Sequence, residues 1–277
     1  MPPRFAQVDV FGSGPCMGNP VAVVLGAEEL SDEEMQRFAR WTNLAETTFV
    51  LPPSRPEADY RVRIFTPVLE LPFAGHPTLG TCHAWLEHRG EAQAAGEIVQ
   101  ECEAGLVRIR QGEEELAFEA PPMVRSGPAS DEDAAKVATA LGVEPGEMLG
   151  VEWVDNGPGW IAALFERAER VLELQPGRLD FDLGAVGFHP PGSATAIELR
   201  AFAPVNGLAF EDPATGSLNA SVAQWLIGSG RLEAPYLATQ GAAIDRDGRI
   251  HISRSDDGAI WVGGHTETMI EGWASSS

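Results

Sequence analysis

Basic residues are scarce in this sequence, and their scarcity disfavours two classes of partner. The 277 residues include 19 Lys and Arg against 41 Asp and Glu, which gives a formal net charge of −22. A protein that binds nucleic acid needs a basic stripe to neutralise phosphates, and an anionic membrane surface attracts basic segments. We therefore expect neither nucleic acid nor membrane as a partner.

Cysteines and long apolar runs are also few. Three cysteines, at positions 16, 82 and 102, are too few and oddly numbered for a disulfide framework, so reduced thiols in a cytoplasmic protein are expected. No apolar run approaches the roughly 18 residues of a membrane span. The N-terminus leads into alternating, strand-like sequence rather than the apolar core of a secretion signal.

The common cofactor and nucleophile motifs are missing too. The sequence has no Gly-x-Gly-x-x-Gly, P-loop, His-Glu-x-x-His or Gly-x-Ser-x-Gly pattern. His83 and His88 are five positions apart, which is off the spacing that lets two histidines share a metal on one helix face. We expect no cofactor and no metal.

What the sequence does contain is an internal repeat. Three segments of the first half recur in the same order in the second half, at offsets of 137, 140 and 143 residues: 62–67 with 199–204, 75–86 with 215–226, and 105–109 with 248–252. The repeat predicts two duplicated α+β domains. We assign 1–119 to an N-terminal domain joined by a C-terminal strand at about 264–277, and 120–263 to a C-terminal domain. The Pro- and Gly-rich segment 119–128 is expected to link them.

Each domain is expected to hold one helix that is apolar on nearly all sides and therefore wrapped by sheet. Both helices are expected to begin at tight turns that contain glycine, 74–76 and 214–217. Ser31 and Ser130, each followed by acidic residues, predict the starts of two further helices. The first N–H groups of a helix lack internal partners and carry partial positive charge. Two such starts facing one cleft would bind a carboxylate; the alternative is that the glycines only permit close packing.

Three residues near these helix starts, and Glu46 in a separate segment, are candidates for acid–base chemistry. His76 and Ser217 follow the two glycines, and Asp212 precedes the second helix, where capping and turn roles are the alternatives. Glu46 stands between apolar flanks, so burial would raise its pKa and let it donate and accept a proton; the alternative is a solvent-facing carboxylate at a strand edge.

These residues lie within motifs that resemble those of the PhzF (phenazine biosynthesis) family. The matching segments are 18–24 (GNPVAVV), 43–49 (NLAETTF), 65–67 (FTP), 70–81 (ELPFAGHPTLGT) and 210–217 (FEDPATGS). The resemblance implies the diaminopimelate epimerase-like fold, an α+β fold of two pseudo-symmetric barrels, each a strongly bent sheet around a central helix. The active site would lie between the barrels, and family members are commonly homodimers.

The resemblance also implies roles for individual residues. In the family's isomerase the residue matching Glu46 shuttles a proton in a cofactor-free hydrogen shift within a cyclic dihydro-hydroxyanthranilate. His76 and Asp212 would assist that transfer. The residues implied in binding the carboxylate-bearing substrate are Asn19, Gly75, His76, Gly216 and Ser217.

Two alternatives remain open. Related epimerases and proline racemases use one cysteine at each helix start, so an epimerase or racemase of an amino-acid-like substrate is the first; His76 and Ser217 stand at those places here. A non-catalytic protein that binds small carboxylates is the second. Retention of Glu46 speaks against it, because binding a carboxylate needs only the helix ends.

Overall fold

The computed structural model describes residues 2–88, 90–113 and 115–274. The chain forms two compact units: unit 1 is Met1–Glu119 with Gly263–Ser277, and unit 2 is Ala120–Val262. Residues 1, 89, 114 and 275–277, which the predicted N-terminal domain includes, lie outside the described residues. The described part has five α-helices and both parallel and antiparallel strand pairs, which confirms the mixed helix-and-strand class.

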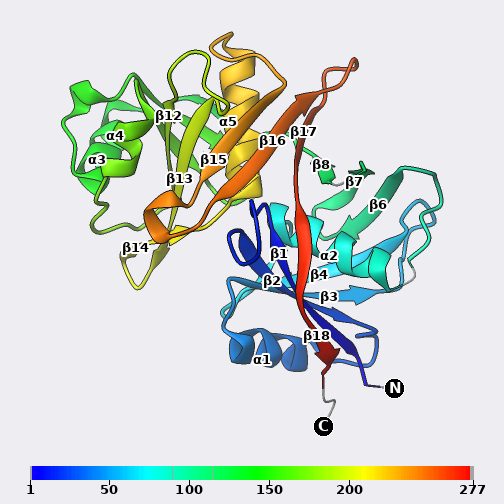
Figure 1. Ribbon diagram of the computed structural model, residues 1–277. Coiled ribbons are helices and arrows are strands. Elements are labelled where there is room, and N and C mark those ends of the chain that lie inside the picture. Colours follow the sequence, from blue (N-terminus) through cyan, green and yellow to red (C-terminus); the bar gives the residue numbers. More distant parts are fainter. Residues whose placement is uncertain (1, 89, 114, 275–277) are drawn as a thin grey trace. The chain divides into compact units, whose positions relative to one another are not determined.

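Unit 1 is built from one curled sheet and two helices (Figure 1). Its elements are β1 (Arg4–Val10), β2 (Asn19–Leu25), α1 (Asp32–Thr42), β3 (Glu46–Leu51), β4 (Tyr60–Phe65), β5 (Glu70–Leu71), α2 (Gly75–Glu87), β6 (Glu97–Cys102), β7 (Gly105–Gln111), β8 (Leu116–Glu119) and β18 (Thr266–Trp273). The strands pair in the order β18–β1–β2–β3–β4–β6–β7–β8, with β2–β3 and β4–β6 parallel.

The sheet of unit 1 wraps around α2. This helix contacts β18 and β8 at the two ends of the strand order as well as β1, β2, β3 and β6, so the sheet must curl around it. The close approach depends on Gly80, where a Cβ atom would lie 2.3 Å from Val21 Cγ1. A helix buried on most sides needs apolar or small residues there, which accounts for the composition of α2.

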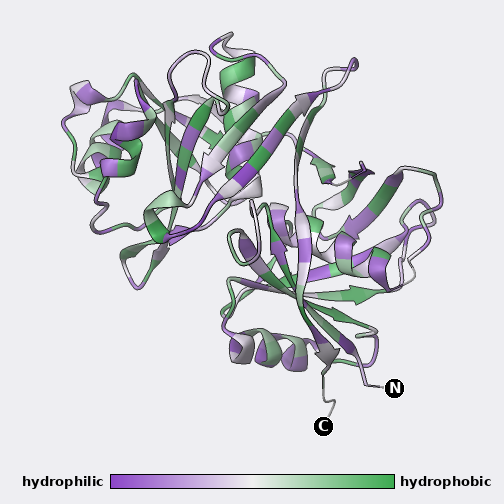
Figure 2. Cartoon of the chain, in the orientation of Figure 1, coloured by the Kyte–Doolittle hydropathy of each residue, from purple (hydrophilic) through white to green (hydrophobic). Residues whose placement is uncertain are grey.

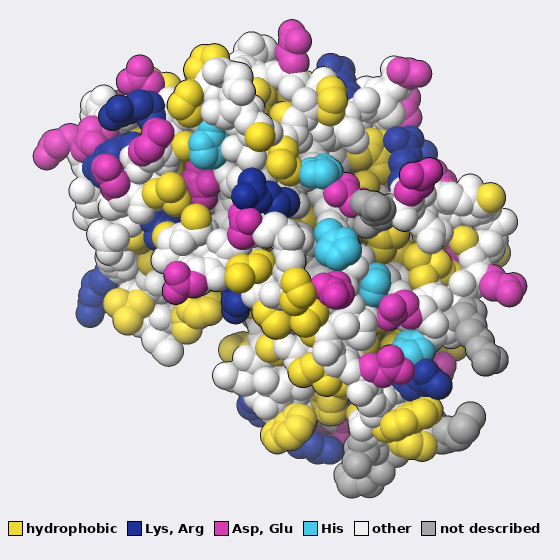
Figure 3. Space-filling view, in the orientation of Figure 1, with side chains coloured by type: hydrophobic (Ala, Val, Ile, Leu, Met, Phe, Trp, Pro, Cys, Tyr) yellow, Lys and Arg dark blue, Asp and Glu magenta, His cyan; other side chains and the backbone are white. Residues whose placement is uncertain are grey.

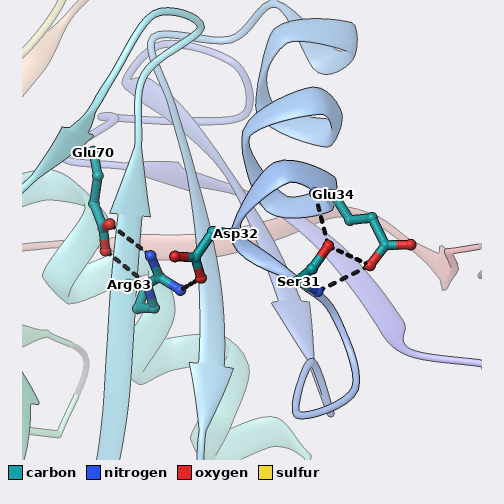
Figure 4. A network of polar contacts seen from close by, with 5 residues as sticks. All are labelled: Ser31, Asp32, Glu34, Arg63 and Glu70. Carbon is teal, nitrogen blue, oxygen red and sulfur yellow. Dashed lines mark hydrogen bonds and ion pairs between the residues drawn. The ribbon is translucent and has the colours of Figure 1, made fainter.

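Helix α1 lies on the other side of this sheet and is amphipathic, with polar and apolar residues alternating along it in Figure 2. Its buried residues Met35 and Ala39 pack against a cluster that includes Phe49. The Ser31 side chain accepts from the Glu34 backbone N–H, while the Glu34 carboxylate accepts from the Ser31 backbone N–H at 2.9 Å (Figure 4). This confirms the predicted helix start.

Unit 2 repeats the topology of unit 1. Its elements are β9 (Arg125–Pro128), α3 (Asp131–Leu141), the 3₁₀ turn η1 (Pro145–Glu147), β10 (Gly150–Asp155), β11 (Ile161–Phe165), α4 (Ala168–Glu173), β12 (Leu183–Phe188), β13 (Ile197–Val205), β14 (Leu208–Asp212), α5 (Gly216–Gly228), β15 (Tyr236–Gln240), the 3₁₀ turn η2 (Ala242–Ile244), β16 (Gly248–Arg254) and β17 (Ile260–Gly264), within which the unit boundary falls. The run β10–β11–β12–β13–β15–β16 pairs with the same directions as β1–β2–β3–β4–β6–β7.

One pair of side chains shows that the repeat holds residue by residue. Arg63 binds Glu70 through two bonds of 2.7 Å, and Arg200 binds Glu211 through bonds of 3.0 and 2.6 Å. Each arginine stands two residues before a phenylalanine that pairs with the bonded glutamate across a hairpin. The Arg63 fork is drawn in Figure 4, where Asp32 provides a third oxygen.

The segment expected to link the domains is only partly irregular. Residues 125–128 form β9, which pairs with β10 through contacts such as Gly127 opposite Trp153. Proline and glycine suit the edge of a sheet, because an edge strand needs only some of its N–H groups for pairing. The local composition therefore gave no sign of this strand, which forms by pairing with β10.

The described basic side chains form no continuous stripe on the face of the molecule shown in Figure 3. On the face shown in Figure 3, Lys and Arg side chains stand singly or in small groups among acidic ones. No helix in the described ranges is long and apolar enough to cross a membrane. Among the same residues, no three His, Cys, Asp or Glu side chains are grouped so that they could hold a metal ion.

Candidate active site

In unit 1 the fold brings together three of the predicted site residues. Glu46 begins β3, His76 is the second residue of α2, and Asn19 begins β2. His76 Nε2 lies 3.2 Å from Glu46 Oε2, and Asn19 Nδ2 lies 3.2 Å from His76 Nδ1. Parallel pairing of β2 with β3 sets Val21 beside Glu46, so both strands start at the N-terminal end of α2.

His76 is neutral in this setting. It is 4% exposed, and burial lowers its pKa to about 3. The Asn19 amide nitrogen can only donate, so His76 Nδ1 accepts and Nε2 carries the proton. The contact with Glu46 is therefore that of an N–H beside a carboxyl group. The two atoms are close but not aligned as a hydrogen bond, and His76 Nε2 has no other hydrogen-bond partner among the described residues.

In unit 2 a buried glutamine organises the turn that leads into α5. Gln240 is 1% exposed. Its Nε2 donates to the Asp212 carbonyl and to Thr215 Oγ1, both at 2.9 Å, and its Oε1 accepts from the Thr215 N–H and from Asn219 Nδ2, both at 3.0 Å. The Thr215 hydroxyl also donates to the Asp212 carboxylate. This network fixes Asp212 at the entrance to α5.

Ser217 is held by a different loop. Asn156 Nδ2 donates to the Ser217 carbonyl at 2.8 Å, and Trp160 Nε1 donates to Ser217 Oγ at 3.1 Å. Both side chains are buried, with exposures of 7% and 5%. Asp212, Gly216 and Ser217, predicted as site residues, thus lie together in unit 2, as Asn19, Glu46, Gly75 and His76 do in unit 1.

The α-helices differ at their N-terminal ends. The starts of α1 and α3 are capped by the side chains of Ser31 and Ser130, whereas α2 and α5 have no side-chain cap bond, and the short helix α4 also lacks one. Uncapped N–H groups at a buried helix start are donors for an anion, and the helix dipole favours negative charge there.

Sequence reasoning missed several polar residues of these regions. Asn156, Trp160 and Gln240 lie in segments without a recognisable motif, and only the folded sheet brings them to α5, where Gln240 bonds Asn219. Asp182 is a further case, because strand register makes it the unit 2 counterpart of Glu46: Thr47 and Leu183 occupy the same paired position. The repeat offset of 137, applied to Glu46, would have pointed to within one residue of Asp182.

Two of the three cysteines, Cys82 and Cys102, are unsuited to acid–base chemistry. Cys82 is fully buried in α2, and burial raises the pKa of its thiol to about 12. Burial also raises the pKa of the Cys102 thiol. A thiolate, the form that acts as nucleophile or base, is therefore disfavoured at both positions.

Comparison with known proteins identifies the family of this chain. The family model described as PhzC-PhzF, phenazine biosynthesis-like protein, matches residues 8–272. The chain belongs to the PhzC/PhzF family. It is 34% identical to the trans-2,3-dihydro-3-hydroxyanthranilate isomerase of Pseudomonas aeruginosa over 98% of this chain and 99% of that protein. It is 36% identical to antisense-enhancing sequence 1 of Schizosaccharomyces pombe over 97% of each chain.

Solved structures agree on the fold. A PhzF-family protein of Bacillus anthracis superposes with a TM-score of 0.82 at 22% identity, covering all of both chains. A hydroxyproline epimerase of Agrobacterium vitis superposes with a TM-score of 0.58 at 13% identity, covering 98% of this chain and 91% of that one. As a member of the PhzC/PhzF family the protein is an enzyme of the isomerase class.

Proposed function

We propose that this PhzF-family enzyme is a cofactor-independent isomerase that moves a proton within a small carboxylate-bearing substrate such as trans-2,3-dihydro-3-hydroxyanthranilate. The observation that carries the proposal is the contact of Glu46 with neutral, buried His76 at the uncapped start of α2. The similarity to the Pseudomonas isomerase over nearly the whole length of both chains supports the substrate class.

In this proposal Glu46 is the proton carrier. Its carboxylate takes a proton from one ring carbon and returns it to another, so the atoms of the substrate are conserved and only one hydrogen and the double bonds move. A side chain placed for acid–base catalysis contributes roughly 10²–10⁴-fold in rate. His76 Nε2 lies 3.2 Å from Glu46 Oε2, close enough for its N–H to orient the carboxylate before it accepts the proton.

The substrate carboxylate is assigned to the helix starts. The backbone N–H groups of Gly75, His76, Gly216 and Ser217 would donate to it, and Asp212 would orient the polar groups of the ring. For a chain with net charge −22, backbone donors and helix dipoles provide attraction for an anion without a lysine or arginine. We also propose that each unit is one of the pseudo-symmetric barrels of the diaminopimelate epimerase-like fold, which the repeated topology supports.

Racemisation or epimerisation of an amino-acid-like substrate is the second candidate, favoured by the structural likeness to the hydroxyproline epimerase. Inversion of a stereocentre needs a base and an acid on opposite faces. The buried thiols of Cys82 and Cys102, with their raised pKa values, do not suit that role. Isomerisation by one carboxyl group is the better match.

The test is solvent exchange at carbon. The purified protein is incubated with trans-2,3-dihydro-3-hydroxyanthranilate in deuterium oxide, and both product and deuterium at ring carbon are followed by NMR. We expect turnover with the wild type and a loss of about 10²–10⁴-fold in Glu46→Gln. Glu57→Gln, a change at an exposed glutamate of the same unit, is the matched control and should behave as wild type.

Two results would contradict the proposal. Full activity in Glu46→Gln would remove the proton carrier. Failure of the wild type to convert this substrate, together with deuterium exchange at the α-carbon of a proline-type amino acid, would favour the epimerase candidate.

A further inference from the structure

The loop between β10 and β11 reaches one residue of the candidate site from both of its ends. Asn156 and Trp160 are four positions apart, and both donate to Ser217, the first to its carbonyl and the second to its hydroxyl oxygen. In unit 1, His76 has the same place in α2, and its contact comes from Asn19 at the start of β2.

The loop itself is held rigidly. The Asp155 carboxylate accepts from the backbone N–H of Gly157 at 2.7 Å and of Gly159 at 2.8 Å. These glycines have φ angles of 138° and 97°, which residues with a side chain adopt only with strain. The loop is thus shaped to present Asn156 and Trp160 at fixed positions.

The chemistry of Trp160 decides the direction of the Ser217 hydroxyl. An indole N–H can only donate, so Ser217 Oγ must accept this bond. The hydroxyl proton of Ser217 is then directed elsewhere, and no hydrogen bond from it to another group is present among the described residues. Ser217 is 6% exposed, so bulk water is a poor substitute for a partner.

A second polar atom of the same loop, Asn156 Oδ1, is also available to a ligand. Asn156 Oδ1 is buried and has no hydrogen-bond partner within the described ranges, while Nδ2 of the same amide is used on Ser217. Buried polar atoms are usually satisfied, so this acceptor beside Ser217 is open to a donor from a bound molecule.

We propose that Trp160 is a positioning residue that makes Ser217 a dedicated hydrogen-bond donor to the carboxylate of the substrate. This inference rests on the proposed function, because it assigns a carboxylate to the start of α5. Trp160 does not touch the reacting atoms; it acts through the serine hydroxyl. Without the indole N–H, the hydroxyl is free to rotate and to satisfy its oxygen in other ways.

The test compares two tryptophans of similar burial. Trp160→Phe removes the N–H that bonds Ser217 and keeps a ring in place. Trp225→Phe is the matched control, because Trp225 is also 5% exposed and its Nε1 has no hydrogen-bond partner among the described residues. Calorimetry measures the binding of anthranilate, a planar ring carboxylate, and of anthranilamide, its uncharged counterpart.

We expect Trp160→Phe to weaken anthranilate binding about five- to tenfold, because the Ser217 hydroxyl remains but is no longer held in direction, and to weaken anthranilamide binding less. KM for the isomerase substrate should rise more than kcat falls. Trp225→Phe should change neither the two affinities nor KM and kcat. In a Ser217→Ala background, Trp160→Phe should cause no further loss, since its effect passes through that hydroxyl.

Several outcomes would overturn the inference. One is equal behaviour of Trp160→Phe and Trp225→Phe, and another is an undiminished effect of Trp160→Phe in the Ser217→Ala background. Should Trp160→Phe fail to fold, the Trp160 indole N–H resonance of the wild type is compared with that of Ser217→Ala. An upfield shift and faster exchange in Ser217→Ala support the inference, and an unchanged resonance overturns it.

The inference and the proposed function fail in different ways. A wild type that turns over the substrate while Trp160→Phe matches its control retains the function and loses the inference. A wild type that binds anthranilate with the expected dependence on Trp160, but converts nothing, retains the inference and loses the function. A wild type that binds no anthranilate and converts nothing loses both.

Discussion

The two units of this protein have one topology and different chemistry. At matching positions of the sheet they share an arginine–glutamate fork, Arg63 with Glu70 and Arg200 with Glu211. At the start of the central helix, His76 in one unit stands where Ser217 stands in the other. The shared residues hold the hairpin and strand edge, whereas those that differ surround the two helix starts. The duplicated fold thus keeps its framework and differs in the residues at the starts of its central helices.

The largest difference we expect between the units is the stability contributed by their arginine–glutamate pairs, Arg63 with Glu70 and Arg200 with Glu211. Arg200 and Glu211 have exposures of only 6% and 8%, and Arg200 also donates to the carbonyls of Val171 and Leu174 at 3.1 and 2.8 Å. Arg200→Met would leave a buried carboxylate unpaired, a change that costs about 3–5 kcal/mol. Arg63→Met, in the half-buried fork of unit 1, should cost about 1–2 kcal/mol. Urea denaturation of both variants measures the two losses, and equal losses would show that the forks are energetically alike.

The second difference concerns acid. Burial lowers the folded-state pKa of His76 to about 3 from its ordinary value of 6.5, so the unfolded chain binds a proton between these pH values that the folded chain does not. Stability contributed by this group is complete above pH 6.5 and falls by about 2 kcal/mol between pH 7 and pH 5. His76→Gln should remove this part of the pH dependence, whereas His88→Gln, at the other end of α2, should retain it. Denaturant titrations at pH 7 and pH 5 measure this change in stability. An unchanged dependence of stability on pH in His76→Gln would contradict the burial argument.

Unit 2 should respond to pH with the opposite sign. Burial, with the neighbouring charge of Asp155, raises the pKa of Asp182 to about 6 from 3.8. The folded chain therefore holds a proton between these values that the unfolded chain has lost, and stability falls as the pH rises through this window. Asp182→Asn should stabilise the protein by roughly 3 kcal/mol at pH 8 and by almost nothing at pH 3.5. The exposed Asp180→Asn serves as control, and a gain that is independent of pH would refute the assignment.

Local signals explain why part of the architecture was predictable. Ser31 and Ser130, each followed by acidic residues, marked the starts of α1 and α3 because a cap is made within four residues of the chain. The repeat was visible because both units need the same pattern of arginine, apolar strand and small-residue helix. The residues of the motifs, Glu46 and His76 among them, stand together in the fold as well.

The local sequence does not show which residues strand pairing brings to equivalent or neighbouring positions. Asp182 shares the position of Glu46, and β9 is a strand despite its Gly and Pro, because of sheet pairings that no window of neighbouring residues contains.

By itself, then, the sequence determined the family, the duplication and the identity of the helix-start residues, because each depends on side chains that are close along the chain. Only the tertiary structure decided that the His76 imidazole is neutral beside Glu46 and that Gln240 fixes Asp212. It also decided that Trp160 holds the Ser217 hydroxyl. The physical reason is that burial and hydrogen-bond direction arise when distant strands meet around a helix.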